Sequence, residues 1–308
     1  EDLGIPYRYL TVEVKPENLE AAMKALVAWN MKGIHLTIPH KVEVLKYLDH
    51  IADDAKIMGA VNTVYVKDGE LYGENTDGKG FIKSLQNAGI EIKGKKVFML
   101  GAGGAARAIA VELANAGAKQ LVILNRSEER GSELKELLEK NTKMQVEFQK
   151  WSETAVIDED TDILVNTTSI GLYPNVDEKP DIDFDSIRPE MTVCDVIPNH
   201  PHTQLLKEAE KRGAKTVDGL GMLINQAVES FRLWTGMTAN AEKMKEALKV
   251  LGFSEVYEVA AGADVSAMAE ADHYVNHVGK DLPFLATSCC PSWSVMAKNN
   301  FPELAGCV

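Results

Sequence analysis

The sequence predicts an α/β protein whose larger part is a doubly wound parallel sheet, preceded by a smaller α/β domain. Apolar segments of strand length alternate with helical segments from about residue 79 to residue 218, and strands separated by helices form a parallel sheet covered on both faces. A glycine-rich turn joins the first of these strands directly to a helix. The 308 residues are enough for about two domains of ordinary size.

Composition and charge restrict the classes of partner. Hydrophobic residues make up 45% of the chain and charged residues 26%, as in ordinary globular proteins. The formal net charge of −13 provides no general attraction to nucleic acid or to anionic membranes. No signal peptide or membrane-spanning segment is visible, and the four cysteines are too few for a disulfide framework. We therefore expect a cytoplasmic protein with no nucleic-acid or membrane partner.

The first domain is expected over residues 1–78 and alternates strands with helices. The spacing of its apolar residues predicts a strand at 9–14, a helix at 17–30, a strand at 33–38, and helices at 41–48 and 52–58. A hairpin follows, with strands at 61–66 and 70–73. Its turn is Asp68-Gly69, a dipeptide that favours the positive φ angles of two-residue turns.

The second domain is expected over residues 79–218. Its apolar strands are predicted at 96–100, 121–124, 146–148, 162–165, 192–194 and 215–217. Two helices are predicted after it, at 222–235 and 239–251. After about residue 249 the alternation ends, and the remaining residues form a separate piece of sequence.

The glycine-rich turn predicts a dinucleotide site. It comprises Gly101, Gly103, Gly104 and Ala105, within a G-x-G-x-x-A pattern that runs from a strand into a helix. Glycines in this context let backbone N–H groups approach a pyrophosphate at the positive end of the helix dipole. A plain glycine turn is the alternative, and the strand–turn–helix context favours the dinucleotide.

The end of the second strand favours NADP over NAD. NAD enzymes usually carry an acidic residue there, which binds the ribose 2′-hydroxyl. This chain has Asn125, Arg126 and Ser127, with Arg130 one helical turn later. The two guanidinium groups are permanently charged donors suited to a 2′-phosphate. The alternative for Arg130 is a solvated helix residue beside two glutamates.

Three short segments of the first domain, residues 33–41, 59–63 and 73–78, place polar residues beside glycine at the ends of predicted strands. Asn, Thr and Asp side chains in such places can hydrogen-bond the hydroxyls of a small polyol. Lys41 begins a predicted helix. A lysine near a carboxylate can donate a proton to a carbonyl oxygen as hydride arrives at carbon. Taken alone, Lys41 has a simpler interpretation as an exposed lysine.

Taken together, the polar segments and the glycine turn resemble the shikimate dehydrogenases. The motifs that carry the resemblance, in the family's order and over residues 1 to about 248, are Thr37-Ile38-Pro39-His40-Lys41, Gly59-Ala60-Val61-Asn62-Thr63, Asn75-Thr76-Asp77-Gly78, Gly101-Ala102-Gly103-Gly104-Ala105, Asn125-Arg126-Ser127 and Gly219-Leu220-Gly221-Met222-Leu223-Ile224-Asn225-Gln226. The resemblance implies NADPH-dependent reduction of 3-dehydroshikimate to shikimate. It also implies that residues 219–248 pack back on the first domain.

The resemblance implies a role for each matching residue. Lys41 and Asp77 match the catalytic pair, and an ammonium group held by a carboxylate supplies the donor needed where negative charge develops. The residues at substrate-binding positions are Thr37, Asn62, Gln226 and His35. The residues at further cofactor positions are Thr167, Gly219 and Met222. A core residue of an apolar helix is the alternative for Met222.

The first domain departs from the family pattern. The family begins with a further strand and a Ser-x-Ser segment that binds the substrate carboxylate, and we expect both to be missing ahead of Glu1. Because a missing interior strand leaves backbone groups unpaired, such a chain is expected to bind NADP better than shikimate. His35 stands where Asn is usual and Pro198 where Tyr is usual, which leaves shikimate and quinate both open.

Residues from about 249 to 308 resemble a different family, the iron-only hydrogenases. The similarity rests on residues 283–293 and 301–304, and it implies that Cys290 matches a cluster ligand and Cys289 a proton relay. The family's later cysteine motifs are absent, and a cubane cluster needs more ligands, so hydrogenase activity is not expected. His273 and His277 are interpreted as exposed residues, and no metal site is predicted.

The full prediction is a truncated N-terminal α/β substrate domain, a doubly wound NADP-binding domain of the Rossmann type, and an extra C-terminal α/β fragment. Its function is that of an NADP-dependent shikimate dehydrogenase acting on a small molecule, as a monomer or homodimer. The alternatives are a quinate/shikimate dehydrogenase, a non-catalytic NADP-binding module and an iron–sulfur electron carrier.

Overall fold

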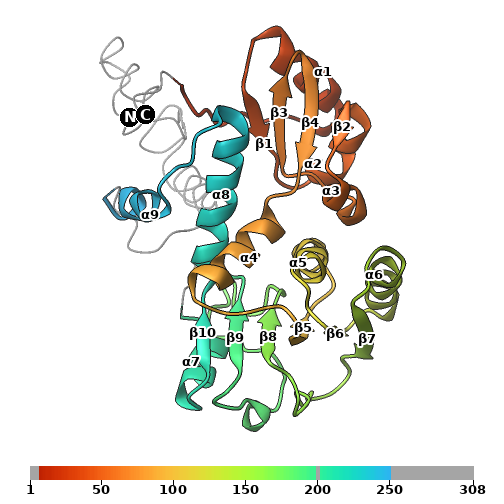
Figure 1. The fold of residues 1–308 in the computed structure, drawn as a ribbon, viewed down its shortest axis with the longest axis vertical. Coiled ribbons are helices and arrows are strands. Elements are labelled where there is room, and N and C mark those ends of the chain that lie inside the picture. The colour runs from red at the N-terminus through yellow and green to blue at the C-terminus, as the bar shows by residue number, and fades with distance from the viewer. Residues whose placement is uncertain (1–6, 199–201, 251–308) are drawn as a thin grey trace, which may run out of the picture. The chain divides into compact units, whose positions relative to one another are not determined.

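The computed structural model describes residues 7–198 and 202–250, which form two β-sheets and their helices (Figure 1). Within these ranges no helix is both long enough and apolar enough to cross a membrane. The hydrogenase-like residues, including both histidines and both cysteines named above, lie outside the described part of the chain.

The first sheet is mixed and has four strands. They are β1 (Gly33–His35), β2 (His50–Ile51), β3 (Thr63–Lys67) and β4 (Glu70–Glu74), in the order β1-β3-β4-β2. The helices that accompany them are α1 (Leu19–Ala28), α2 (His40–Glu43) and α3 (Asp53–Met58), with 3₁₀ turns at Pro16–Asn18 and Val44–Tyr47. One side of α1 is buried because Leu19, Met23 and Leu26 share a core with Val64 and Leu71 of the sheet.

The structure corrects two predictions for this domain and confirms one. The hairpin of β3 and β4 is confirmed, and Asp68 and Gly69 in its turn have φ angles of 54° and 84°. The strand predicted at 9–14 is wrong, because β1 pairs only with β3 and no described strand pairs with residues 7–15. The helix predicted at 41–48 is also wrong in part, since α2 ends at Glu43 and a 3₁₀ turn follows.

The second sheet is parallel throughout and confirms the doubly wound arrangement. Its strands are β5 (Lys96–Leu100), β6 (Gln120–Asn125), β7 (Gln145–Lys150), β8 (Ile163–Asn166), β9 (Thr192–Asp195) and β10 (Lys215–Val217). Their order is β10-β9-β8-β5-β6-β7, so the chain winds from β5 to one edge and then from β8 to the other. Ligands of such sheets bind at the carboxyl ends of the strands, where the order reverses.

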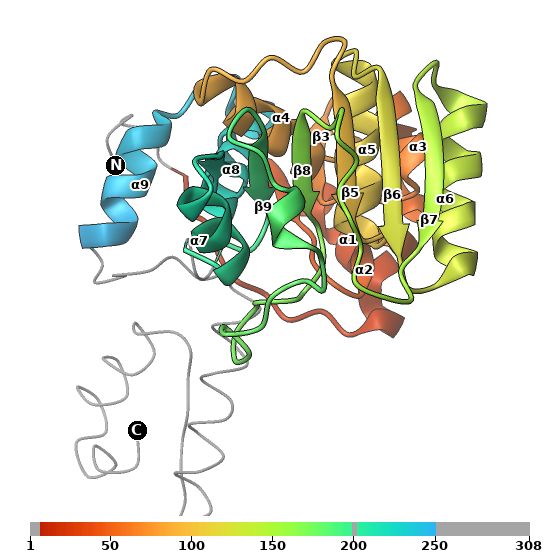
Figure 2. The same ribbon diagram turned by 90° about the horizontal axis from the view of Figure 1, so that it is seen from below.

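Helices cover both faces of this sheet, because alternate residues of each strand point to opposite sides. Val97 and Met99 of β5 share a core with α5 (Gly104–Asn115) and α6 (Glu128–Asn141). Phe98 and Leu100 share the opposite core with α7 (Gln204–Lys211). Figure 2 shows β7, β6, β5, β8 and β9 side by side in this layer.

Two long helices, α4 (Asp77–Asn87) and α8 (Gly219–Thr235), pack against each other between the sheets. Gly80 of α4 permits this contact, since a Cβ atom there would lie 2.6 Å from the carbonyl oxygen of Met222 in α8. Near its C-terminus α8 also reaches the first sheet, where Trp234 Nε1 donates to the carbonyl oxygen of Val64 (2.9 Å). The last described helix is α9 (Ala241–Val250).

Candidate active site

Lys41 and Asp77 lie together. Lys41 belongs to α2 and Asp77 is the first residue of α4, and Lys41 Nζ is 2.9 Å from Asp77 Oδ2. The two side chains are 28% and 22% exposed, so a small molecule can reach both. An ammonium group has three N–H donors, and Asp77 is the one acceptor that Lys41 Nζ has among the described residues. Lys41 therefore keeps donors for another molecule.

A buried amide holds the second oxygen of Asp77. Asn62 lies just before β3, is 3% exposed, and donates from Nδ2 to Asp77 Oδ1 (2.8 Å) and to Thr76 Oγ1 (3.0 Å). Asn62 Oδ1 in turn accepts from the backbone N–H of Thr76 (2.8 Å) and from Thr63 Oγ1 (3.0 Å). Because these bonds fix both ends of the amide, they also fix the carboxylate that it holds.

The same network reaches α8 and His35. Ser230 of α8 is fully buried, and its Oγ lies 2.8 Å from Thr63 Oγ1 and 2.7 Å from His35 Nε2. The other ring nitrogen of His35 is 3.0 Å from the hydroxyl of Tyr9, and the ring packs edge-on against Trp234. Burial lowers the pKa of His35 to about 4. The ring is therefore neutral near pH 7, and both of its nitrogens are within hydrogen-bond distance of protein hydroxyls.

The remaining substrate candidates differ in how they are held. Gln226 of α8 accepts at Oε1 from Thr76 Oγ1 (3.4 Å), which places it on the network of Asn62. Thr37 is exposed in the turn before α2, and its carbonyl oxygen accepts from the backbone N–H of His40 (2.9 Å). The structure thus brings Gln226 and Asn62 together and leaves Thr37 on the surface beside α2.

The glycine-rich turn after β5 has the geometry that a dinucleotide requires. Gly101 has a φ angle of 106°, which favours glycine, and a Cβ atom there would lie 2.7 Å from Thr167 Oγ1. At Gly103 and Gly104 a Cβ atom would meet nothing within 4 Å, so this part of the turn faces open space. α5 begins at Gly104 without a side-chain cap, which leaves its first N–H groups available to a phosphate.

The residues after β6 form a fixed turn with two exposed cations. Ser127 caps α6 by accepting from the backbone N–H of Arg130 (3.3 Å), and Asn125 Nδ2 donates to the carbonyl oxygen of Ser127 (2.8 Å). Arg126 and Arg130 are exposed. In the described part of the chain neither guanidinium forms an ion pair. Both charges are therefore available to an anion such as a 2′-phosphate.

The other cofactor candidates are held in different ways, and only Thr167 lies at the reversal point of the sheet. Thr167 follows β8, and its Oγ1 donates to the carbonyl oxygen of Leu100 at the end of β5 (2.6 Å). Gly219 begins α8, whose N-terminus is capped by Asp218. Met222 is partly buried and packs against the core of the second sheet. Its backbone contact with α4 and this packing are compatible with either interpretation of Met222.

Helix α4 connects the Lys41–Asp77 pair with the residues around the glycine-rich turn. Gly78, the residue after Asp77, lies against α5, where a Cβ atom would be 2.4 Å from the carbonyl oxygen of Ala108. From α5, Arg107 Nη1 reaches the carbonyl oxygen of Met58 at the end of α3 (3.5 Å). The Lys41–Asp77 pair therefore neighbours the helix that begins at the glycine-rich turn.

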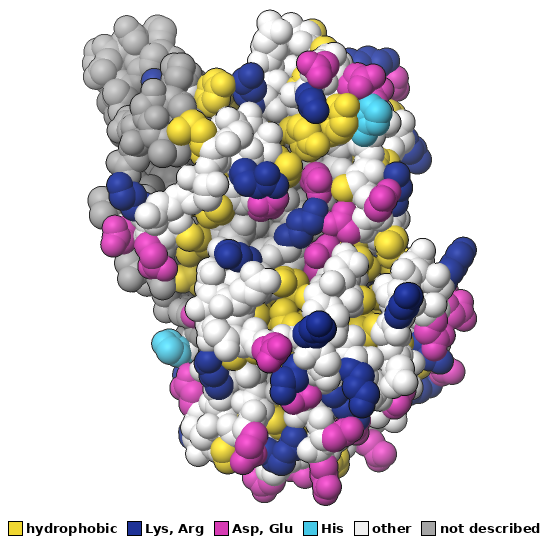
Figure 3. Space-filling view, viewed as in Figure 1, with side chains coloured by type: hydrophobic (Ala, Val, Ile, Leu, Met, Phe, Trp, Pro, Cys, Tyr) yellow, Lys and Arg dark blue, Asp and Glu magenta, His cyan; other side chains and the backbone are white. Residues whose placement is uncertain are grey.

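A second charged group, the Lys79 cluster, lies where α3, α4 and α5 meet and consists of Lys79, Asp54, Glu74 and Glu112. Lys79 Nζ is 2.8 Å from Asp54 Oδ2 and also pairs with Glu74. Although burial favours the neutral amine, hydrogen bonds to both carboxylates raise the pKa of Lys79. Burial and the neighbouring Asp54 raise the pKa of Glu112 to about 7. Figure 3 shows basic and acidic side chains close together in the middle of the molecular face that it presents.

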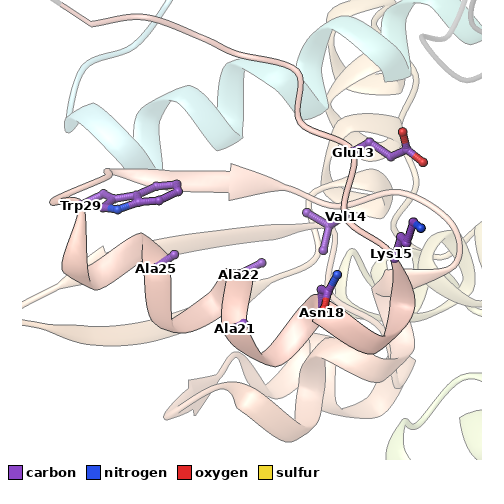
Figure 4. A pocket seen from close by; sticks show the side chains of 8 residues that line it. All are labelled: Glu13, Val14, Lys15, Asn18, Ala21, Ala22, Ala25 and Trp29. Atoms are coloured by element: carbon purple, nitrogen blue, oxygen red, sulfur yellow. The ribbon is translucent and has the colours of Figure 1, made fainter.

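The structure also contains a hollow of about 460 Å³ beside α1 (Figure 4). It is lined by Glu13, Val14, Lys15, Asn18, Ala21, Ala22, Ala25 and Trp29. No predicted site residue lines it, and α1 contributes only three alanine side chains to its wall, with the indole ring of Trp29 just after the helix. The hollow therefore adds nothing to the candidate active site.

Sequence reasoning missed two features of this region. Ser230 follows Gln226 by four residues in a largely apolar helix, and that spacing places both on one helix face. This signal was available and could have found Ser230. The Lys79 cluster has no comparable signal, because its members come from β4 and three different helices.

Three families match parts of the chain. The shikimate dehydrogenase substrate binding domain matches residues 1–64, and the shikimate/quinate 5-dehydrogenase family matches residues 83–173. The C-terminal domain of the iron-only hydrogenase large subunit matches residues 224–308, so that match begins within α8. Most of the last match lies outside the described residues.

The chain is similar to curated proteins over most of its length. It is 44% identical over 249 residues to the shikimate dehydrogenase (NADP(+)) of Methanocaldococcus jannaschii, covering 80% of this chain and 88% of that protein. It is 42% identical over 246 residues to the shikimate dehydrogenase (NADP(+)) of Bacillus subtilis, covering 80% and 87%.

Solved structures agree on the fold. A ligand-free 5-ketofructose reductase from a Gluconobacter species is 44% identical with a TM-score of 0.78, covering 81% of this chain and 90% of that one. A shikimate dehydrogenase in complex with NADP+ is 41% identical with a TM-score of 0.73, covering 80% and 86%. A Listeria monocytogenes shikimate 5-dehydrogenase in complex with shikimate and NAD is 34% identical with a TM-score of 0.76, covering 80% and 88%.

Proposed function

Because the chain belongs to the shikimate dehydrogenase family, we propose that it reduces 3-dehydroshikimate to shikimate, with NADP as its cofactor. One observation carries the proposal: Lys41 and Asp77 form an accessible ion pair beside the helix that starts at the glycine-rich turn. Relatives above 40% identity that are named for the same reaction and cofactor support it.

In the proposed mechanism the bound NADPH supplies a hydride to the carbonyl carbon. Negative charge then develops on the carbonyl oxygen, and the ammonium group of Lys41 donates a proton there to complete the new hydroxyl. The carboxylate of Asp77 orients Lys41 and accepts a hydrogen bond from a neighbouring substrate hydroxyl. In the reverse reaction the neutral amine of Lys41 removes the hydroxyl proton.

The residues around the second sheet fit the cofactor. The open space at Gly103 and Gly104 admits a pyrophosphate close to backbone N–H groups. The unpaired guanidinium groups of Arg126 and Arg130 suit the 2′-phosphate. Thr167, on the other side of the reversal point, is proposed to lie near the nicotinamide.

The proposed substrate position lies between α2, β3 and α8. Thr37 is exposed there, and the amide nitrogen of Gln226 has no hydrogen-bond partner among the described residues. Both are proposed to bind substrate hydroxyls. Asn62 already shares its amide with Asp77 and Thr76, so a substrate hydroxyl would replace the bond to Thr76. His35 is engaged at both nitrogens and is proposed to act through Ser230.

The test is an assay of NADP+ reduction with shikimate, alongside quinate, with NADPH oxidation measured on 3-dehydroshikimate and on 5-ketofructose. We expect the highest kcat/KM on the shikimate couple. The 5-ketofructose arm is required because a reductase named for that substrate is 44% identical to this chain. Faster turnover of 5-ketofructose, or none of shikimate by a chain that binds NADPH, would contradict the proposal.

A further inference from the structure

The guanidinium group of Arg126 lies over the aromatic ring of Trp151. Its guanidinium carbon lies 5.5 Å from the ring centroid of Trp151, within the range of a cation–π contact. Arg126 follows β6 and Trp151 follows β7, the neighbouring strand at the edge of the sheet. The contact is therefore made at the carboxyl ends of two adjacent parallel strands, on the side where the glycine-rich turn also lies.

The ring that supports Arg126 is itself fixed. Trp151 is 7% exposed and belongs to the core on one face of the second sheet. Its indole Nε1 donates to the carbonyl oxygen of Asp181 (3.0 Å), and its backbone N–H donates to the carbonyl oxygen of Asn125 (3.0 Å). The second bond ties Trp151 to the residue that precedes Arg126. The position of the Trp151 ring is therefore fixed relative to the backbone at Arg126.

Arg126 combines this support with an uncommitted charge. Its side chain is exposed, and within the described residues it forms no ion pair. The neighbouring cation Lys150, in contrast, is paired with Glu128 (3.2 Å). A guanidinium held over a ring by a cation–π contact keeps all its N–H donors for an approaching anion, because the ring face accepts no conventional hydrogen bond from them. An exposed arginine without such support loses more rotamer freedom when it binds.

We propose that Trp151 is a positioning residue that sets the preference of this protein for NADP over NAD by holding Arg126 for the 2′-phosphate. Trp151 itself does not touch the cofactor in this proposal. The inference rests on the proposed NADP site and goes beyond it by naming a residue outside the glycine turn and outside the turn after β6. Its effect is confined to the phosphate that distinguishes the two dinucleotides.

The experiment measures the dissociation constants of NADPH and NADH for the full chain, by titration at constant ionic strength. Trp151→Leu is expected to weaken NADPH about threefold to tenfold, the size of a cation–π contact with its orientation effect. Its dissociation constant for NADH should stay within about twofold, since NADH has no 2′-phosphate. Trp151→Phe keeps an aromatic face, and its affinity for NADPH should fall between those of the wild type and the leucine variant.

Arg126→Leu provides the matched control. It should weaken NADPH more than Trp151→Leu does, and adding Trp151→Leu to it should cause no further loss. Binding of NADH reports that each variant is folded, and Trp151→Phe supplies the comparison if the leucine variant does not fold.

The proposal is overturned if the Trp151 variants weaken NADPH and NADH equally, if they leave NADPH unaffected, or if their losses add to that of Arg126→Leu. Absence of NADPH binding by the wild-type chain would instead contradict the proposed function, so the two failures are distinguishable.

Discussion

Two lysine–carboxylate groups each include one residue from the first turn of α4, Asp77 in one and Lys79 in the other. They differ in whether the ammonium group keeps hydrogen-bond donors for another molecule. At the Lys41–Asp77 pair one ammonium meets one carboxylate, and Lys41 has no other side-chain acceptor among the described residues. At the Lys79 cluster one ammonium meets Asp54 and Glu74, with Glu112 beside them. The first group can act on a further molecule, whereas the second is filled by the protein itself.

The comparison shows that a lysine with one carboxylate partner is available for catalysis, whereas a lysine shared by several carboxylates stabilises the fold. Lys79 joins α3 and β4 to α4, and its neighbour Glu112 extends the group to α5. A cation shared between several elements stabilises their arrangement. Lys41 instead lies in the first turn of a short helix and has one partner, which orients its ammonium group without using all of its donors.

The largest expected effect is on the first group. Lys41→Ala should lower kcat for shikimate oxidation about 10²- to 10⁴-fold, because the proton donor is lost. The dissociation constant of NADPH should be unchanged. Lys46→Ala is the matched control, since Lys46 is exposed and pairs only with nearby Glu43 (2.7 Å). Unaltered turnover of the Lys41 variant would remove this residue from the mechanism.

The next largest effect is expected at the Lys79 cluster and concerns the free energy of unfolding. Lys79→Met leaves three neighbouring carboxyl groups without their cation, which should lower the free energy of unfolding by about 2 kcal/mol, below the value for a fully buried pair. Denaturant unfolding measures it. Lys24→Met, which breaks an exposed helix pair with Glu20 (2.6 Å), should cost less than about 0.5 kcal/mol. Equal losses in the two variants would refute the distinction between them.

A smaller effect on turnover should follow from removing one hydrogen bond of the network that supports the Lys41–Asp77 pair. Ser230→Ala removes a hydroxyl in contact with His35 and Thr63, and we expect kcat to fall about tenfold through displacement of Asn62. Binding of NADPH should persist. Ser84→Ala is the control, because that buried hydroxyl donates only to the carbonyl oxygen of Phe81 (2.7 Å). A matching loss of kcat in the control would count against a positioning role.

The smallest effect is a pH dependence of stability at the second group. The pKa of Glu112 is raised from 4.5 to about 7, so between these pH values the folded chain binds a proton that the unfolded chain has released. Its contribution to stability therefore falls as pH rises through this window. Asp54, Lys79 and Asn115 face the Glu112 carboxyl.

Glu112→Gln should consequently be more stable than the wild type at pH 8, by about 1 kcal/mol after allowance for its partial exposure, or about 2 °C in Tm. The difference should vanish near pH 4. Glu136→Gln, at an exposed position of α6, should show no such trend. Buried Asp195, whose pKa burial raises to about 6, is present in all three proteins and cancels in the comparison.

Local patterns predicted most of the second sheet and its turn. The strands at Lys96–Leu100 and Lys215–Val217 were predicted to the residue. The first was evident because its last four residues form a continuous buried apolar run. The turn at Gly101 needs a positive φ angle, and the glycines in the sequence predict a turn of this kind. The Lys41–Asp77 contact came instead from the resemblance of the motifs to a family. Spacing alone left Lys41 without a partner.

By itself, the sequence determined the doubly wound class, the glycine turn and the two arginines, since each depends on residues close together in the chain. Tertiary structure alone decided which groups are saturated and which stay available. Residues 9–14 have strand composition but no described partner strand, and Ser230 and His35 meet across 195 positions. The physical reason is that strand pairing and hydrogen-bond capacity are properties of neighbours in space, which a one-dimensional pattern does not contain.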